Sequence, residues 1–260
     1  MSGGDGLAAL VLSIDLELDL EHHERQLERR LDEVRSQLVA MTVATGIPAT
    51  WAVADPMLSA ASESILAAGC GHEIAVLGDQ AWLGPGCGRV RLARELARRF
   101  SAPRKAGISV NTLALRNVEH VLDLDLLIEH GVTALCGPAV EQLSVAKKLG
   151  QPPIRFGLWQ PPAAWSIAPR RGWLSPVAWP IRREIKRTVR QRSLLHVRLD
   201  ALRLVDGPDW ALDDVAAFLR YIAAKRDGGQ LAIETLGHLA ARALDCRASI
   251  PSRSILRPAA

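Results

Sequence analysis

The most constraining feature of the sequence is a short apolar run near its start that ends on two acidic residues. Residues 8–12 are all apolar, and Asp15 and Glu17 follow shortly after them. A short apolar run between polar residues is typical of a strand that is buried on both faces, as in a parallel sheet. Acidic residues just past such a strand lie at its carboxyl end, where α/β folds carry their functional residues. Asp15 and Glu17 therefore mark a candidate site, although simple solvation of a strand end would also explain them.

Segments with helical periodicity alternate with short apolar segments along most of the chain. Leu27, Leu31, Val34 and Leu38, for example, recur at the spacing of one helix face. The other segments predicted to be helical are 58–69, 90–100, 118–130, 212–225 and 236–244, and the strands after the first are predicted at 49–53, 73–77, 108–113, 132–136, 194–199 and 230–233. This alternation predicts right-handed βαβ units around a parallel sheet. The number of units, about seven, favours a closed or nearly closed α/β barrel over an open sheet.

The alternation fails between residues 137 and 191. This segment holds eight of the 15 prolines and four of the seven tryptophans. Segments of this length and composition are often functional, for example as lids. We therefore expect one domain at about residues 8–245, in which 137–191 forms an insertion that covers the site, and a basic tail at 246–260.

Composition excludes several classes of protein. A chain of 260 residues with 48% hydrophobic residues can bury a substantial core. No apolar run reaches the roughly 18–20 residues of a membrane span, and the amino terminus lacks the basic region of a secretory signal. The four cysteines are scattered, which predicts neither a disulfide framework nor a thiolate zinc site. A cytoplasmic location is therefore expected.

Several motifs, in order and spacing, resemble the polysaccharide deacetylase (NodB-homology) family over roughly residues 8–136 and 190–245. The motifs that carry the resemblance are Ser13-Ile14-Asp15, Gly46-Ile47-Pro48-Ala49-Thr50-Trp51, Gly71-His72-Glu73-Ile74, Leu115-Arg116-Asn117, Leu195-His196-Val197 and Gly228-Gly229-Gln230. The resemblance implies a distorted (β/α)7 barrel, which agrees with the strand count. It also implies carbohydrate metabolism, with metal-dependent hydrolysis of acetyl groups on polysaccharides as the usual activity.

The resemblance assigns catalytic roles to three residues of this chain. Asp15 matches the catalytic base, Arg116 the arginine that orients the base, and His196 the general acid. Since a charge beside an apolar strand needs a partner, Arg116 is expected to pair with Asp15. Each assignment has a structural alternative: Arg116 would form an ion pair that only stabilises the fold, and His196 would be a hydrogen-bonded core histidine.

The metal site of the family is missing from the sequence. Leu16 stands where a second acid is usual, and Leu77 and Ala81 stand at the positions of the two metal-binding histidines. Apolar side chains have no lone pair to give to a metal ion. No cofactor is therefore expected, and the chain is predicted to be a catalytically degenerate pseudoenzyme. A divalent metal such as zinc would bind only to a site rebuilt around Asp15 with Glu17, His22 or His23.

Two interpretations of function remain, and both have an acetylated saccharide or glycoconjugate as the expected partner. The first is a degenerate relative that binds carbohydrate or acts as a scaffold, and the second is an active deacetylase with a rebuilt metal site. Trp159, Trp165 and Trp173 are expected to bind the saccharide, since aromatic faces stack on sugar rings. The basic cluster between Arg182 and Arg190 is either a solvated helix face or a contact for an anionic membrane or a nucleic acid. No motif typical of nucleic-acid binding accompanies it.

Overall fold

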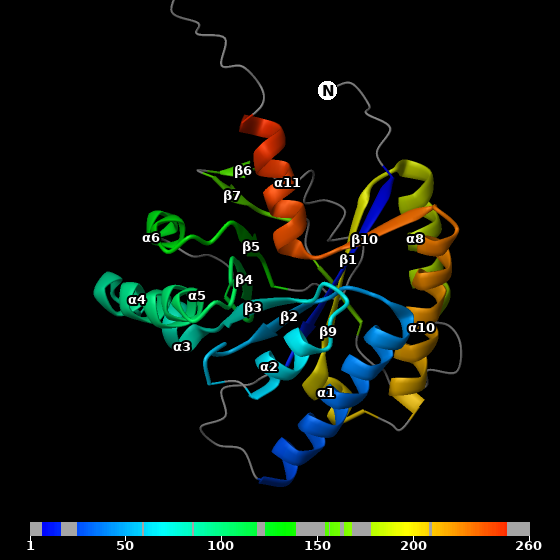
Figure 1. Ribbon diagram of the computed structural model, residues 1–260, viewed down its shortest axis with the longest axis horizontal. Coiled ribbons are helices and arrows are strands. Elements are labelled where there is room, and N and C mark those ends of the chain that lie inside the picture. Colours follow the sequence, from blue (N-terminus) through cyan, green and yellow to red (C-terminus); the bar gives the residue numbers. More distant parts are fainter. Residues whose placement is uncertain are drawn as a thin grey trace, which may run out of the picture.

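A mainly parallel sheet, curled into a half-barrel, forms the centre of the molecule (Figure 1). The structure is a computed structural model that describes residues 7–16, 25–58, 60–84, 86–118, 123–138, 154–155, 157–161, 164–167, 178–207 and 210–248. The strands follow the order β6-β7-β5-β4-β3-β2-β1-β9-β8, and β10 pairs with β1 beside β2. All of these pairs are parallel except β6 with β7. The α/β barrel-like class predicted from the sequence is confirmed.

The predicted order of strands and helices is recovered, with differences at several boundaries. The strands are β1 (Ala8–Asp15), β2 (Thr50–Val53), β3 (Glu73–Gly78), β4 (Thr112–Leu115), β5 (Ala134–Cys136), β6 (Ile154–Arg155), β7 (Leu158–Trp159), β8 (Trp165–Ile167), β9 (Leu194–Asp200) and β10 (Leu231–Glu234). The helices are α1 (Arg25–Thr45), α2 (Ala60–Ala67), α3 (Gln80–Leu83), α4 (Arg89–Leu96), the π-helical turn η2 (Ala97–Ser101), α5 (Ala102–Lys105), α6 (Leu124–Glu129), α8 (Ala178–Gln191), α9 (Ala201–Val205), α10 (Trp210–Asp227) and α11 (Leu236–Ala248).

One boundary differs because a helix extends further than the sequence predicts. The helix expected to end at residue 100 continues through η2 into α5, and the Ile108 amide donates to the Pro103 carbonyl. This bond closes the end of α5, so β4 starts at Thr112 rather than at residue 108. The helix predicted at 118–130 is described only as α6, since residues 119–122 lie outside the described part of the chain.

The outer face of the sheet carries the main hydrophobic core. Every residue of β1 is buried, and side chains alternate between the two faces of a strand. Leu10, Leu12 and Ile14 therefore face outward and pack in one cluster with residues of the covering helices, such as Leu38 and Leu219. Figure 1 shows α1, α8 and α10 along this part of the sheet. The alternate residues of β1 are left to face the inside of the half-barrel.

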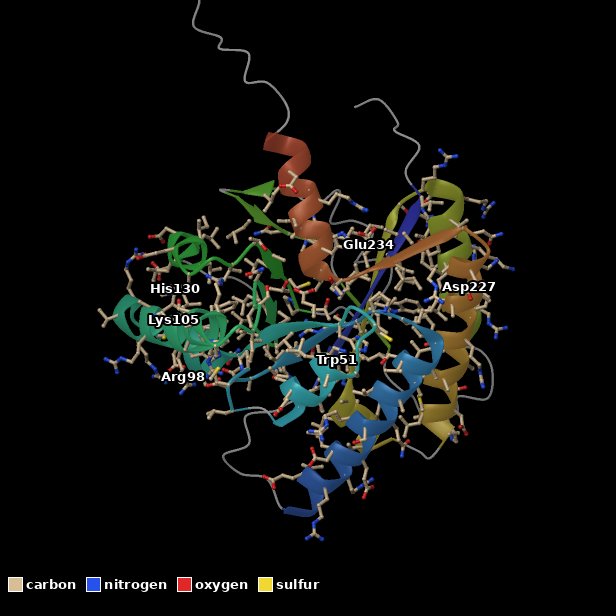
Figure 2. The ribbon with its side chains drawn as sticks, in the orientation of Figure 1. Trp51, Arg98, Lys105, His130, Asp227 and Glu234 are labelled. Carbon is tan, nitrogen blue, oxygen red and sulfur yellow. The ribbon has the colours of Figure 1, made fainter. Side chains whose placement is uncertain are left out.

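The inner face is lined by small side chains and closed by the last helix. Four strands contribute alanines here (Ala52, Ala75, Ala114 and Ala134). Leu236, Leu239 and Ala240 of α11 pack against them, and α11 lies in front of the sheet in Figure 1. Trp51, in contrast, is fully buried in the outer core (Figure 2). Lys105 of α5 and Asp227 of α10 are exposed at the surface.

The start of α11 is fixed by Glu73, a half-buried glutamate at the start of β3. The Glu73 carboxylate accepts hydrogen bonds from the Gly237 amide at 2.8 Å, from the Thr50 hydroxyl at 2.9 Å and from the Thr112 hydroxyl. The first amides of a helix have no partner within the helix, and a carboxylate there also suits the helix dipole. Glu73 thus connects β2, β3, β4 and α11.

Replacing Gly237 by alanine is expected to lower the free energy of unfolding by about 1–3 kcal/mol, the usual cost of overpacking. A Cβ at this position would lie 2.6 Å from Glu73 Oε1, so the carboxylate would have to leave its hydrogen bonds. Gly88→Ala is the matched control, because a Cβ there meets nothing within 4 Å. Urea unfolding of both variants tests this. Equal stability of the two would show that Glu73 does not constrain Gly237.

The segment 137–191 contributes to the sheet at both of its edges. β7 pairs with β5 at one edge, β8 pairs with β9 at the other, and α8 packs on the outside. Those described parts belong to the barrel itself rather than to a lid. The expected cover would involve residues 139–153 and 168–177, which lie outside the described residues, as does the tail from residue 249. Among the described helices, none is both long and apolar enough to span a membrane.

Candidate functional site at the carboxyl ends of the strands

An aspartate and an arginine form a buried ion pair where β1 and β9 end. Arg198 Nε lies 2.9 Å from both carboxylate oxygens of Asp15, and Arg198 Nη2 lies 2.8 Å from Oδ2. The two residues are only 5% and 3% exposed. Arg198 Nη1 donates to the carbonyls of Leu115 and Gly137, at 3.0 and 3.3 Å. The guanidinium therefore joins the carboxyl ends of β1, β4 and β9 to the residue that follows β5.

Burial and the mutual attraction of the two charges have opposite effects on the pKa values of Asp15 and Arg198. Burial raises the pKa of the Asp15 carboxyl above its ordinary value, and the Arg198 guanidinium opposes that shift. Burial alone would lower the pKa of Arg198, but the Asp15 carboxylate more than compensates, so the pKa of the guanidinium is raised. Arg198 is therefore a permanent cation, and each oxygen of Asp15 is directed toward it.

Arg116 does not form the ion pair that the sequence predicts for it. Its Nη2 lies 3.2 Å from Asp200 Oδ2, and Arg203 approaches the same oxygen at 3.7 Å. Asp15 instead pairs with Arg198, because β9 lies directly beside β1 whereas Arg116 follows the more distant β4. The positive charge of Arg116 still opposes part of the rise in the pKa of Asp15. Asp15 and Arg116 thus share one site without a direct bond.

His196 lies one layer deeper than the ion pair. Since residues two apart in a strand face the same side, His196 sits below Arg198 on the inner face of β9. Its Nε2 is 2.9 Å from the Ser13 hydroxyl, its Nδ1 is 3.7 Å from Cys136 Sγ, and the residue is 2% exposed. Burial raises the pKa of Cys136 to about 12, which keeps the neighbouring thiol protonated. This setting favours the core-histidine interpretation, and the role of general acid stays a prediction.

The residues at the family's metal positions do not fit a metal ion. Leu77 packs within the apolar inner cluster, and Ala81 is an exposed residue of α3. Leu16 packs in the outer core, on the other face from Asp15. A divalent ion at Asp15 would also lie close to the Arg198 guanidinium, and like charges repel strongly where water is excluded. At these positions, the described residues thus offer a metal ion only the Asp15 carboxylate, which is already paired with Arg198.

Within the described ranges, no group of three or more His, Cys, Asp or Glu residues is arranged to hold a metal ion. Glu17, His22 and His23, on which a rebuilt site would depend, lie outside those ranges. Asp79 accepts a hydrogen bond from the Ala81 amide at 2.9 Å and so caps α3. It therefore serves the turn after β3.

The three tryptophans predicted to bind a saccharide do not form one surface. Trp159 belongs to the inner cluster, whereas Trp165 belongs to the outer core. Trp173 lies outside the described residues. Trp159 of β7 is the register partner of Ala134, the first residue of β5. It lies with Ala9 and Leu194 around the amino ends of β1 and β9, and so away from Asp15 at the carboxyl end of β1. A saccharide-binding role for these residues stays a prediction.

The basic cluster predicted to contact an anionic surface lies on α8. Ile181 and Ile185 of this helix are buried against the sheet, and five basic residues of the helix are exposed (Arg182, Arg183, Lys186, Arg187 and Arg190). Arg182 also lies over the Tyr221 ring of α10, with 5.3 Å between its guanidinium carbon and the ring centre. The helix thus has the amphipathic arrangement expected, and its contact with a membrane or nucleic acid stays a prediction.

The sequence patterns do not single out two residues of the site, Arg198 and Asp200. Both belong to a strand that the sequence predicts correctly, and they follow His196 at intervals of two. The period of a strand places His196, Arg198 and Asp200 on one face. Polar residues at every second position of a buried strand are the sequence pattern from which Arg198 and Asp200 could be predicted as site residues.

No family model and no curated protein matches the sequence. Solved structures do match it. A protein from Mycobacterium smegmatis assigned as a polysaccharide deacetylase has a TM-score of 0.66 and 17% identity, over 100% of this chain and 98% of that chain. The chain shares the fold of that protein. An allantoinase matches with a TM-score of 0.63 and 12% identity, over 94% of this chain and 91% of the other.

A 4-α-glucanotransferase from Thermococcus litoralis also matches, with a TM-score of 0.63 and 14% identity, over 91% of this chain and 40% of that chain. These proteins carry different activities, and identities this low show a common fold alone. The shared fold therefore assigns no activity to this chain.

Proposed function

We propose that this protein is a polysaccharide deacetylase-like protein that binds an acetylated saccharide or glycoconjugate and does not hydrolyse it by the metal-dependent route. The observation that carries the proposal is the buried pair of Asp15 and Arg198. In active members of the polysaccharide deacetylase family, which this sequence resembles, the matching aspartate acts as a base beside a metal ion. Here a guanidinium supplies the positive charge next to the carboxylate.

A base must be able to take a proton from water or substrate. Both oxygens of Asp15 already accept hydrogen bonds from Arg198, and the residue is 5% exposed. Without a metal, the attacking water would keep the pKa of bulk water, which lies far above that of any aspartate. The pair is therefore suited to hold the strand ends in place, and poorly suited to activate water.

The rim of the same site retains groups that can recognise a saccharide. The side chains of Arg116, Asp200 and Arg203 are 20%, 16% and 46% exposed. Together they offer donors and acceptors that are already held in place by mutual ion pairs. Hydroxyl and acetamido groups pair with such donors and acceptors. The rim can thus bind a saccharide without any change at Asp15.

The test combines metal binding, hydrolysis and saccharide binding on the purified full chain. Isothermal titration with zinc, cobalt and nickel salts should show no ion bound at one per chain. Acetate release from acetylated chito-oligosaccharides and acetylated xylan should stay at the background rate. The same saccharides should bind, and Arg116→Gln should weaken that binding about tenfold, the effect of losing one hydrogen bond to a charged group. Lys105→Gln, on exposed α5, is the control and should leave binding unchanged.

Two results would overturn this proposal. One metal ion per chain, lost in Asp15→Asn and accompanied by metal-dependent acetate release, would establish an active hydrolase with a rebuilt site. Absence of both ion and saccharide binding would leave the chain with the fold of the family and another role.

A further inference from the structure

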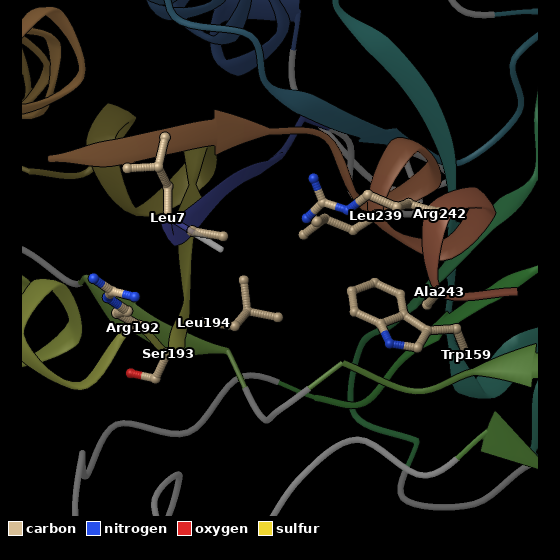
Figure 3. A pocket seen from close by; sticks show the side chains of 9 residues that line it. Leu7, Trp159, Arg192, Ser193, Leu194, Leu239, Arg242 and Ala243 are labelled. Carbon is tan, nitrogen blue, oxygen red and sulfur yellow. The ribbon is translucent and has the colours of Figure 1, made fainter. Parts of the chain in front are cut away.

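A cavity lies at the opposite end of the half-barrel from Asp15. It has a volume of about 320 Å³ and opens at the amino ends of β1 and β9, beneath α11 (Figure 3). Ligand pockets in proteins usually have volumes of roughly 300–1,000 Å³, so this one suits a small molecule. Arg116, Asp200 and Arg203, which form the rim at Asp15, do not line it, so a ligand here would be independent of the proposed function.

Most of the cavity wall is apolar. Trp159 of β7, Leu194 of β9 and Leu239 of α11 converge on it, as Figure 3 shows. Trp159 and Leu239 are nearly buried, whereas Leu7 at the rim is 60% exposed. A large apolar side chain left exposed beside an apolar hollow favours an apolar occupant, since burying both surfaces removes them from water.

One arginine at the rim adopts a backbone conformation that an arginine rarely takes. Arg192 directly follows α8 and has a φ of 47°, in the left-handed region. This position after a helix is usually glycine, because a side chain there strains the backbone. The chain thus keeps a guanidinium at the mouth of the cavity at some cost in stability. Strain of this kind is often found at functional sites.

A second arginine faces the cavity from the other side. Arg242 of α11 lies across from Arg192 in Figure 3, and its Nη1 is bound to Glu234 Oε1 at 2.7 Å. A guanidinium carries five N–H donors, so Nη2 and Nε of Arg242 still have donors for a ligand. Two guanidinium groups beside an apolar wall match a molecule that has one anionic end and one apolar end.

We propose that this cavity binds a small amphipathic monocarboxylate. Its apolar tail would pack against Trp159, Leu194 and Leu239, and its carboxylate would pair with Arg192 and Arg242. Arginine recognises carboxylates through paired N–H donors, which explains why the chain uses arginine at both rim positions.

Octanoate is a suitable probe, and 1-octanol and octyltrimethylammonium are its neutral and cationic counterparts. In isothermal titration of the full chain, octanoate should bind about tenfold more tightly than 1-octanol, the effect of one charge-assisted pair. Arg192→Gln should remove that advantage. Arg183→Gln, which takes a charge from the exposed side of α8 outside the cavity, should keep it. Ala243→Trp should fill the cavity and abolish binding. Equal binding of the three probes, or no effect of Arg192→Gln or Ala243→Trp, would overturn the proposal.

Arg192→Gly provides a test that does not depend on loss of folding. Glycine relieves the left-handed strain, so the Tm should rise by about 2 °C while the affinity for octanoate falls about tenfold. An unchanged affinity in this variant would contradict the proposal. So would octanoate binding that appears only after residues 1–6 are removed, since the chain's own amino terminus would then be the occupant.

Discussion

Replacing Arg198 by methionine is expected to lower the free energy of unfolding by about 3–5 kcal/mol, the usual cost of leaving one partner of a buried ion pair alone. Methionine keeps much of the volume but leaves the Asp15 carboxylate without its three close nitrogen contacts. It also leaves the carbonyls of Leu115 and Gly137 without the donor at Nη1. Urea unfolding at neutral pH measures the loss.

A second change in the same site separates the ion pair from general damage to the core. In the double variant Asp15→Asn with Arg198→Met, no charge is left buried, so the loss should be smaller than for Arg198→Met alone. Arg203→Met is the control at the exposed rim and should cost about 1 kcal/mol or less. An Arg198→Met variant no less stable than this control would mean that the pair contributes nothing to the fold.

This ion pair also links the stability of the fold to the proposed function. The contacts that hold β1 and β9 together are the contacts that occupy both oxygens of Asp15. A chain that needed Asp15 as a base would have to release it from Arg198 and leave a cation buried. Under the proposed function, the pair can instead remain intact while a ligand binds at Arg116 and Asp200.

The fold could be predicted from the sequence because its long elements have clear periods. β1, with apolar residues on both faces, and α1, with one apolar face, are both found where the sequence places them. The short strands β6, β7 and β8 were not predicted. They have only two or three residues each, too few to show a period, and they are strands because neighbouring strands pair with them.

The site could be predicted only in part. The position of Asp15 follows from its place at the end of an apolar run, and the structure places Arg116 in the same site. The partner of Asp15 could not be read from chain order, because Arg198 follows it by 183 residues and meets it only through the pairing of β9 with β1. Polar residues that alternate within a buried strand are the general sign of such a partner.

Glu73→Ala is expected to lower the free energy of unfolding by about 3 kcal/mol, because each buried donor left without an acceptor costs about 1–3 kcal/mol. The donors concerned are the Gly237 amide and the hydroxyls of Thr50 and Thr112. Glu129→Ala, on the exposed side of α6, is the matched control and should change little. A loss no larger than that of the control would show that α11 is held by its apolar face alone.

The conservative variant Glu73→Gln tests the charge itself. Burial raises the pKa of Glu73 above its ordinary value, although hydrogen bonds from Thr112, Gly237 and Thr50 oppose the shift. The folded state therefore holds this proton more tightly than the unfolded state, so the contribution of Glu73 to stability falls as pH rises from the unfolded pKa to the raised folded pKa. Glutamine fits the same place, because threonine hydroxyls can accept as well as donate, but it does not titrate. Urea unfolding across this window should show a shallower decline with pH in Glu73→Gln than in the parent. Identical slopes would mean that Glu73 has the same pKa in the folded and unfolded states.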